Sequence, residues 1–149
     1  MRFVIQRVNN ASVDIDNETV GSIDKGFLVL VGISGTDTRQ IADKMVKKLI
    51  GMRIFDDEND KINLDLKAVN GNLLLVSQFT LYADCKHGNR PGFTDAGAPD
   101  MASEMFDYIV SEVRKEFPDA ATGRFGADMK VSLLNDGPFT IILDSDNIM

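Results

Sequence analysis

The sequence predicts a strand-rich α+β domain with two main helices. Several short segments alternate apolar and polar residues, which is typical of half-buried strands. Two longer segments place apolar residues at helical spacing, so that each has one apolar face. At 149 residues the chain has the length of one domain, and we assign residues 1–149 to a single domain.

The composition indicates a globular protein of the cytoplasm. Apolar residues make up 44% of the chain and charged residues 26%, which is ordinary for a globular protein. No apolar run approaches the roughly 20 residues that cross a membrane, and the first residues turn polar too soon for a secretion signal. The single cysteine, Cys85, cannot form an internal disulfide and fits a reducing compartment.

The net charge of −7 argues against broad nucleic-acid binding, because such binding depends on neutralising phosphates. A small local contact with an RNA end stays open. Lys44, Lys47 and Lys48 form a basic stripe on the first predicted helix. A solvated helix face is the favoured interpretation of this stripe, and contact with RNA phosphates is the alternative.

The first part of the chain predicts strands. Residues 1–8 predict one strand, and residues 11–15 alternate apolar with polar side chains as a second. A turn is expected at residues 17–18, after which Val20 opens a short return strand. The continuous apolar run of residues 27–31 is better explained by a strand buried on both faces.

Two helices are predicted from apolar periodicity and from signals at their ends. Asp37 is the expected N-cap of the first helix, and Gly51 lies where that helix should end. The second helix is expected near residues 99–117, where a proline suits the first turn and Pro118 stops the helix. Their apolar faces consist of Ile41, Ala42, Met45, Val46, Leu49 and Ile50 in the first helix and of Met101, Ala102, Met105, Phe106, Ile109, Val110 and Val113 in the second.

The remaining apolar segments predict further strands. Residues 73–82 are expected to form one long strand, followed by a glycine- and proline-rich loop at 86–99. Strands around 129–133 and at 139–143 would be joined by a turn at 135–138. Six or more short strands can close into a barrel or pack as two sheets, and the pattern alone does not choose between them.

Familiar metal and phosphate motifs are absent from the sequence. Phe27 stands where a phosphate-binding loop needs lysine, and the acidic loop at 56–61 lacks the glycine of a calcium site. Cys85 and His87 are the only residues of their types. A thiol–imidazole pair is conceivable, but an unreactive thiol beside a loop histidine is favoured. We therefore expect neither a metal nor a cofactor.

Two segments are less easily explained by the fold alone. Ser77-Gln78-Phe79-Thr80 places polar groups directly after an apolar run. This is a common way to bring chemistry to the edge of a core, although a strand emerging into solvent is an equal alternative. Gly137-Pro138 lies between two predicted strands, where a plain turn is the favoured explanation.

Together these segments resemble the two signature motifs of the D-aminoacyl-tRNA deacylases, namely Ser77-Gln78-Phe79-Thr80 and Asn135-Asp136-Gly137-Pro138-Phe139-Thr140. The resemblance extends over nearly the whole chain, in order and in spacing. Its departures are small, since Gly92 replaces a more usual serine and Phe139 a more usual valine. Further similar segments are residues 1–8, 11–13, 26–32, 53–55, 88–91 and 125–129.

The resemblance implies a barrel-like β structure with helices that works as a twofold homodimer, with the active site at the subunit interface. The implied substrates are tRNA that carries a D-amino acid and tRNA(Ala) that is mischarged with glycine. Ser77, Gln78, Phe79 and Thr80 would line the pocket for the terminal adenosine and the scissile ester.

The resemblance also implies how an L-amino acid is excluded. Gly137 and Pro138, joined by a cis peptide, would reach into the pocket of the partner subunit. Their carbonyl groups would hold the amino group of the substrate and leave no room for an L side chain, so that chirality is tested by steric exclusion. Arg7 would hold this turn in position, and Met129 is placed with the substrate-binding residues.

Thr80 is the obvious candidate nucleophile, but no base stands beside it in the sequence. We therefore expect water to attack, with backbone N–H groups near Phe79 and Thr80 stabilising the oxyanion. The resemblance further implies help from the terminal 2′-hydroxyl of the tRNA. Two alternatives stay open: an editing domain that removes an L-amino acid, as in some threonyl-tRNA synthetases, and a non-catalytic dimeric module that binds RNA or a ligand.

Overall fold

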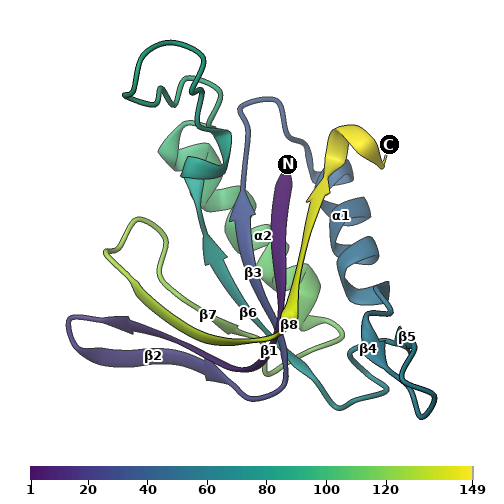
Figure 1. The fold of residues 1–149 in the computed structure, drawn as a ribbon. Helices are drawn as coiled ribbons and strands as arrows, with labels where there is room; N and C mark the ends of the chain where they lie inside the picture. Colours follow the sequence, from purple (N-terminus) through teal and green to yellow (C-terminus); the bar gives the residue numbers. More distant parts are fainter. Residues whose placement is uncertain (149) are drawn as a thin grey trace.

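A strongly curved mixed sheet with two helices against it makes up the computed structural model, which describes residues 1–148 (Figure 1). The helices are α1 (Arg39–Gly51) and α2 (Pro99–Arg114), with short 3₁₀ helices η1 (Phe79–Tyr82) and η2 (Ser145–Asn147). The strands are β1 (Arg2–Ile15), β2 (Glu18–Ile23), β3 (Gly26–Gly32), β4 (Phe55–Asp56), β5 (Ile62–Leu64), β6 (Asn72–Ser77), β7 (Ala121–Thr122) and β8 (Lys130–Asp144).

The long strand β1 organises the sheet. Along one edge it pairs with β3 through residues 2–8 and with β2 through residues 11–15, and along the other edge it pairs with β8. The two strands expected at 1–8 and 11–15 are therefore one. Beyond β3 the sheet continues with β6 and β7, each parallel to its neighbour. Parallel neighbours need crossover connections, and α1 and α2 provide them.

The sheet curls until its two ends meet. A Cβ atom placed on Gly21 of β2 would lie 2.8 Å from the carbonyl oxygen of Thr122 in β7. The edge strands therefore touch, although no ladder of hydrogen bonds joins them among the described residues. The result is a nearly closed barrel, which confirms the barrel-like α+β fold expected from the resemblance and decides against two packed sheets.

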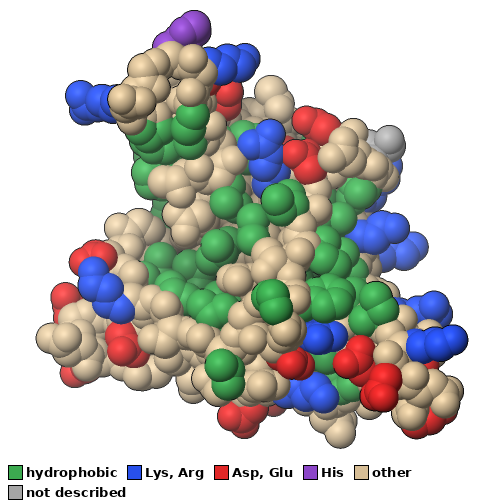
Figure 2. Space-filling model, in the orientation of Figure 1, with side chains coloured by type: hydrophobic (Ala, Val, Ile, Leu, Met, Phe, Trp, Pro, Cys, Tyr) green, Lys and Arg blue, Asp and Glu red, His purple; other side chains and the backbone are tan. Residues whose placement is uncertain are grey.

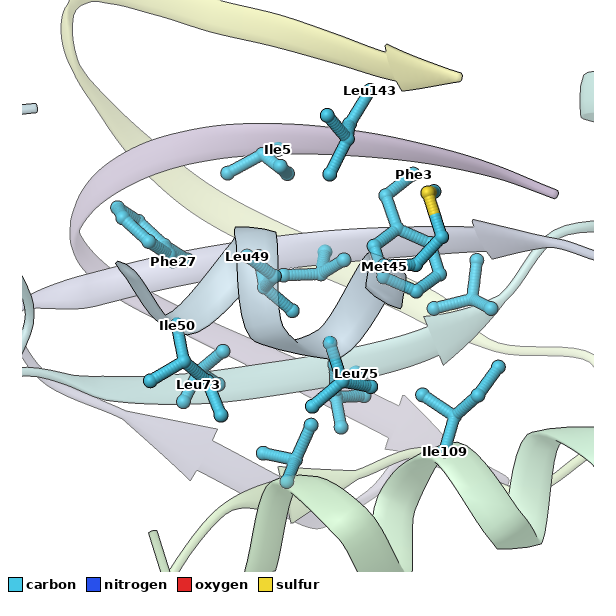
Figure 3. Packing of buried hydrophobic residues seen from close by; sticks show 14 of the residues in the cluster. Phe3, Ile5, Phe27, Met45, Leu49, Ile50, Leu73, Leu75, Ile109 and Leu143 are labelled. Carbon is cyan, nitrogen blue, oxygen red and sulfur yellow. The ribbon is translucent and has the colours of Figure 1, made fainter. Parts of the chain in front are cut away.

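Both faces of the central strands are buried. The smaller core fills the inside of the curl and contains Leu28, Leu74 and Val76, while the larger core lies between the sheet and the helices. Strand β3 is therefore buried on both sides, as the apolar run predicted. Figure 3 shows the larger core, where Phe3, Ile5, Phe27, Leu73, Leu75 and Leu143 of the strands face Met45, Leu49 and Ile50 of α1 and Ile109 of α2.

The predicted ends of both helices need correction. Thr38, not Asp37, is the N-cap of α1, because the Thr38 hydroxyl accepts a hydrogen bond from the Ile41 N–H. The buried Asp37 carboxylate instead accepts from the Met1 amino group and the Ser34 N–H. Helix α2 ends at Arg114 rather than near 117, because the N–H groups of Lys115 and Glu116 donate to carbonyls three residues back and so tighten the chain out of the α-helical pattern.

The predicted strand at 73–82 and the turn at 135–138 are also wrong in outline. Strand β6 stops at Ser77, because its partner β3 ends at Gly32 and leaves no ladder to join; the chain then turns into η1. Residues 130–144 form one strand, and the register opposite β1 shifts on either side of Val8. The segment 135–139 is therefore an irregularity inside β8 rather than a turn between two strands.

Candidate active site

A cavity of about 640 Å³ opens where β6 ends. Its volume is in the range of small-molecule sites. Figure 2 shows the molecule hollowed between the loop of residues 85–91 at the upper left and the strands at the lower left. Most of its lining is apolar, and Asp128 is the one ionisable side chain in it. The lining comprises Val31, Ile33, Val76, Ser77, Gln78, Phe79, Phe93, Ala96, Gly97, Ala98, Pro99, Ala102, Phe125, Gly126, Ala127, Asp128, Met129 and Val131.

The turn after β6 leaves backbone donors free at this cavity. The Gln78 N–H makes the last bond of the ladder, to the Val31 carbonyl 2.8 Å away. Phe79 and Thr80 then open η1, and the first N–H groups of a helix have no acceptor within it. Within residues 1–148, no other backbone carbonyl or side chain accepts from these two N–H groups. Both N–H groups are therefore free to donate to a ligand oxygen, and Phe79 itself lines the cavity.

The Thr80 hydroxyl lies beside this turn but contacts no base. It accepts a hydrogen bond from the Gln78 side-chain amide, which is a donor and cannot remove a proton. Tyr82 is no alternative base, because burial, and secondarily the nearby Asp37 carboxylate, raise the pKa of its phenol to about 12. The Asp128 side chain is 85% exposed and paired with Lys130. The surroundings of Thr80 therefore favour an external nucleophile.

Two aromatic rings form the mouth of the cavity. Phe79 of η1 and Phe93 of the following loop meet edge to face, with ring centroids 5.0 Å apart. Phe79 is nevertheless 57% exposed, although a side chain of this size is normally buried. An exposed aromatic pair beside a cavity is suited to contact a flat ring of a ligand.

The Gly137–Pro138 segment lies apart from this cavity. Its peptide bond is cis, as the resemblance predicted, and both residues are exposed. Neither Gly137 nor Pro138 lines the cavity, and neither does Arg7. Of the predicted site residues, Ser77, Gln78, Phe79 and Met129 are brought together, and Thr80 joins them through Gln78.

Arg7 holds the irregular segment of β8 from below. Its Nε donates to the Asp136 carbonyl at 3.0 Å, and its Nη1 donates to the Ile54 carbonyl at 2.8 Å. The guanidinium also lies over the Phe139 ring, 4.4 Å from the centroid. The planar fork of arginine suits these simultaneous contacts. The buried Arg7 side chain therefore fixes the path of the chain on both sides of Gly137–Pro138.

No metal site accompanies this arrangement in the part of the chain described. Among residues 1–148, no three His, Cys, Asp or Glu side chains gather closely enough to hold an ion. Nor does any helix within those residues have the length and apolar character needed to span a membrane. The free backbone N–H groups and the apolar walls are thus the chemical resources of the cavity.

The model of one family, described as D-Tyr-tRNA(Tyr) deacylase, matches residues 4–144. The chain belongs to this family. A D-aminoacyl-tRNA deacylase of Lactobacillus acidophilus is 56% identical over 144 residues, which cover 97% of this chain and 99% of that protein. A protein of the same name from Chromohalobacter salexigens is 53% identical over 145 residues, covering 97% of this chain and all of the relative.

Two solved structures resemble this member of the D-Tyr-tRNA(Tyr) deacylase family. One, described as c-Myc DNA Unwinding Element Binding Protein, is 37% identical with a TM-score of 0.91, covering 97% of this chain and 98% of that one. The other, described as a probable eukaryotic D-amino acid tRNA deacylase, has a TM-score of 0.81. It is 18% identical and covers 95% of this chain and 97% of its own, so its likeness concerns the fold alone.

Sequence reasoning missed one residue that holds the Gly137–Pro138 segment of this family member in place. The Asn135 amide donates to the carbonyls of Arg7 and Phe139, and its oxygen accepts from the Phe139 N–H. One side chain thereby ties off the loop that carries Gly137–Pro138 and lets β8 resume after it. Asparagine next to a turn is a common local signal, but only the long-range bond to Arg7 reveals this role.

Proposed function

We propose that this chain is a D-aminoacyl-tRNA deacylase, which hydrolyses the ester between a D-amino acid and the 3′ end of tRNA. One observation carries the proposal: Phe79, which lines an apolar cavity, and the adjacent Thr80 have backbone N–H groups without an acceptor among the described residues, in a member of a family with this name. Residues 1–149 act as one deacylase domain, and the substrate places the protein in the cytoplasm.

The cavity supports hydrolysis without a covalent intermediate. Water adds to the ester carbonyl, and the developing oxyanion accepts hydrogen bonds from the N–H groups of Phe79 and Thr80. The bond to the ribose oxygen then breaks, releasing tRNA and the free D-amino acid. In the absence of a base next to Thr80, the 2′-hydroxyl of the terminal ribose assists the proton transfer. Ser77 and Gln78 shape this end of the cavity, and Phe79 with Phe93 receives the adenine ring.

The active site is completed by a second copy of the chain. Strand β8 exposes large apolar side chains, among them Leu134 at 54% and Ile142 at 70%, and Figure 2 shows hydrophobic side chains across the middle of the face where β1 and β8 lie. An apolar patch of this kind marks an interaction surface. A twofold dimer on this face presents two identical turns symmetrically, so each Gly137–Pro138 reaches the cavity of the partner.

Chirality is read by exclusion in this arrangement. The carbonyl groups of Gly137 and Pro138 accept hydrogen bonds from the substrate ammonium group, while Phe79 and Thr80 hold the ester. With both ends fixed, only one direction is left for a side chain, and an L side chain meets the turn. Glycine has no side chain to exclude, so glycyl-tRNA mischarged on tRNA(Ala) is also a substrate. Met129 lines the cavity that holds the substrate.

A paired assay tests the proposal. Wild-type protein is added to D-Tyr-tRNA(Tyr), L-Tyr-tRNA(Tyr) and Gly-tRNA(Ala), and we expect rapid release of D-Tyr and glycine with L-Tyr spared. Gly137→Ala is the test variant, since its Cβ would lie 2.5 Å from the Phe139 nitrogen and displace the turn. It should lose the distinction between D- and L-Tyr. Release of L-Tyr by the wild type would instead identify an editor of L-amino acids.

A second candidate function is nucleic-acid binding without catalysis. The solved structure at 37% identity carries a name that concerns a DNA element, whereas the charge of −7 opposes broad binding of this kind. The same assay separates the two functions. A binding protein would retain charged tRNA without releasing any amino acid.

A further inference from the structure

The loop that follows η1 forms a closed arm above the cavity. Asp84 and Gly92 face each other across an isolated antiparallel bridge, in which each N–H donates to the carbonyl of the other at 2.7 and 2.9 Å. Gly88, with φ of +64°, lies between them and turns the chain in a conformation that suits glycine. Residues 85–91 therefore project as a defined arm, at the upper left of Figure 1.

The tip of this arm is locally basic in an acidic protein. Lys86 and Arg90 are exposed, and no acidic residue occurs between residues 85 and 94. His87 adds an N–H donor between them. Figure 2 shows basic side chains on both sides of the histidine at this tip. The chain as a whole carries −7, so these cations lie where the surrounding protein would not supply a positive surface.

The two cations of the arm are free to bind a partner. No carboxylate lies within ion-pair distance of Lys86 or Arg90 among the described residues. The only carboxylate engaged at the base of the arm, that of Asp84, accepts from the backbone N–H of Lys86. On the facing rim, by contrast, Lys130 is paired with Asp128 at 3.1 Å. Over residues 1–148, the arm thus carries two unpaired cations, whereas the facing rim carries one, Arg124, just before the cavity-lining Phe125.

The arm is also fixed to the cavity that it overhangs. Phe93, just beyond the bridge, packs against Phe79 at the mouth, and Ala96 forms an isolated bridge with Ser34, two residues after the end of β3. Phe93 and Ala96 both line the cavity. A nucleic acid whose last nucleoside enters the cavity would therefore have the arm within reach of its preceding phosphates.

We propose that the arm, through Lys86 and Arg90, binds the phosphodiester groups of the unpaired 3′ end of the tRNA, just before the terminal adenosine. This inference rests on the proposed deacylase function. The occupant is a single-stranded RNA backbone, because the cations act on phosphates without reading bases. His87 donates a hydrogen bond to a phosphate oxygen in the same contact.

The test compares two substrates that differ in phosphates. D-Tyr-tRNA(Tyr) carries the single-stranded end, whereas D-Tyr esterified to adenosine carries the same ester and no phosphate. Lys86→Ala/Arg90→Ala is the test variant. Lys47→Ala/Lys48→Ala on the exposed face of α1 is the matched control, since it removes the same charge from another surface.

We expect the arm variant to raise KM for D-Tyr-tRNA(Tyr) about tenfold, with kcat nearly unchanged. Turnover of the adenosine ester should stay at the wild-type rate, which also verifies folding. For wild-type protein, log affinity against log salt should have a slope of roughly −2 to −4, and the arm variant should flatten it by about 1.4, at ~0.7 per phosphate of a single strand. The α1 variant should change KM less than about twofold.

Three results would overturn the inference. Equal effects of the arm and α1 variants would mean that only net charge matters. A larger effect of Arg124→Ala would mean that the RNA leaves along the facing rim. An arm variant with wild-type KM and slope would mean that the phosphates lie elsewhere. Failure of wild-type protein to cleave either substrate would refute the deacylase proposal itself, which these variants do not address.

Discussion

The turn at Ser77–Thr80 and the turn at Gly137–Pro138 are opposite in almost every physical respect. The first follows a buried strand, borders a cavity and offers backbone donors. The second interrupts an exposed strand, projects into solvent and offers carbonyl acceptors. Within one subunit they do not share a site, since neither Gly137 nor Pro138 lines the cavity. One turn borders a cavity, and the other lies exposed and away from it.

The contrast also extends to what holds each turn in place. The Ser77–Thr80 turn is positioned by the end of the β3–β6 ladder, and so by the fold itself. The Gly137–Pro138 turn depends on two side chains, Arg7 and Asn135, which replace the ladder bonds that β8 loses. Single substitutions should therefore displace the Gly137–Pro138 turn far more readily than the Ser77–Thr80 turn.

The largest effect is expected from breaking the proposed dimer, which would separate the cavity of one subunit from the Gly137–Pro138 turn of the other. Ile142→Asp would put an unpaired carboxylate into each half of a twofold interface, at about 3–5 kcal/mol per copy. We expect monomers in sedimentation and a loss of D-Tyr-tRNA cleavage that follows the loss of dimer. Ile62→Asp on β5, also exposed at 56%, is the control and should leave both unchanged. A fully active monomer at assay concentration would refute the shared site.

The next largest effect is expected from loosening the projecting turn from below. Arg7→Lys keeps the charge but cannot donate to the Asp136 and Ile54 carbonyls with the same fork. We expect cleavage of D-Tyr-tRNA to fall about 10- to 100-fold, because a small misplacement of a binding group is costly. The control is Arg114→Lys at the end of α2, because the Arg114 guanidinium likewise donates two hydrogen bonds, here to the Ala120 carbonyl. If both variants retain wild-type cleavage, Arg7 has no part in positioning the turn.

A smaller effect is expected from untying the turn at its side. Asn135→Ala removes three hydrogen bonds to the backbone around Gly137–Pro138, so we expect about tenfold slower cleavage of D-Tyr-tRNA and a lower Tm. Asn72→Ala removes one hydrogen bond, from the side-chain amide to the Asp119 carbonyl, and should lower Tm without slowing cleavage. Equal activity in the two variants would show that the loop keeps its path without the Asn135 amide.

The smallest effect is expected in the Ser77–Thr80 turn beside the cavity. Thr80→Ala removes a hydroxyl that contacts only an amide donor, while the Thr80 N–H remains. We expect kcat within about fivefold of wild type, measured with D-Tyr-tRNA. Complete inactivation of a folded variant, or an acyl group trapped on Thr80 in the wild type, would establish covalent catalysis and reverse this interpretation.

Periodicity predicted the central elements because burial dictates them. The apolar run at 27–31 and the two amphipathic helices are visible in the sequence, since each buries one or both faces against the same cores. The errors occur where a distant contact overrides local pattern. Residues 79–82 have the apolar composition of a strand but no neighbouring strand to pair with. The Asp37 carboxylate binds the Met1 amino group instead of capping α1.

The candidate site was visible only through motifs. Nothing in the composition of Ser77–Thr80 indicates that its backbone N–H groups are free, because that depends on where β3 ends. The irregularity at 135–139 was mistaken for a turn between strands, because a glycine–proline pair gives the same local signal in both cases. The partners that hold it, Arg7 and Asn135, are far apart in the sequence.

The contact between β2 and β7 is a place where the curved sheet can open locally. Across this seam the sheet is held by packing rather than by a ladder of hydrogen bonds, so its opening requires far less free energy than global unfolding. The chain runs from β7 directly into residues 125–129, which form one wall of the cavity. Amide hydrogens of β7 should therefore exchange with solvent long before those of β1. Transient widening of the seam would admit a bulky aminoacyl end while the cores on either side of the sheet stay intact.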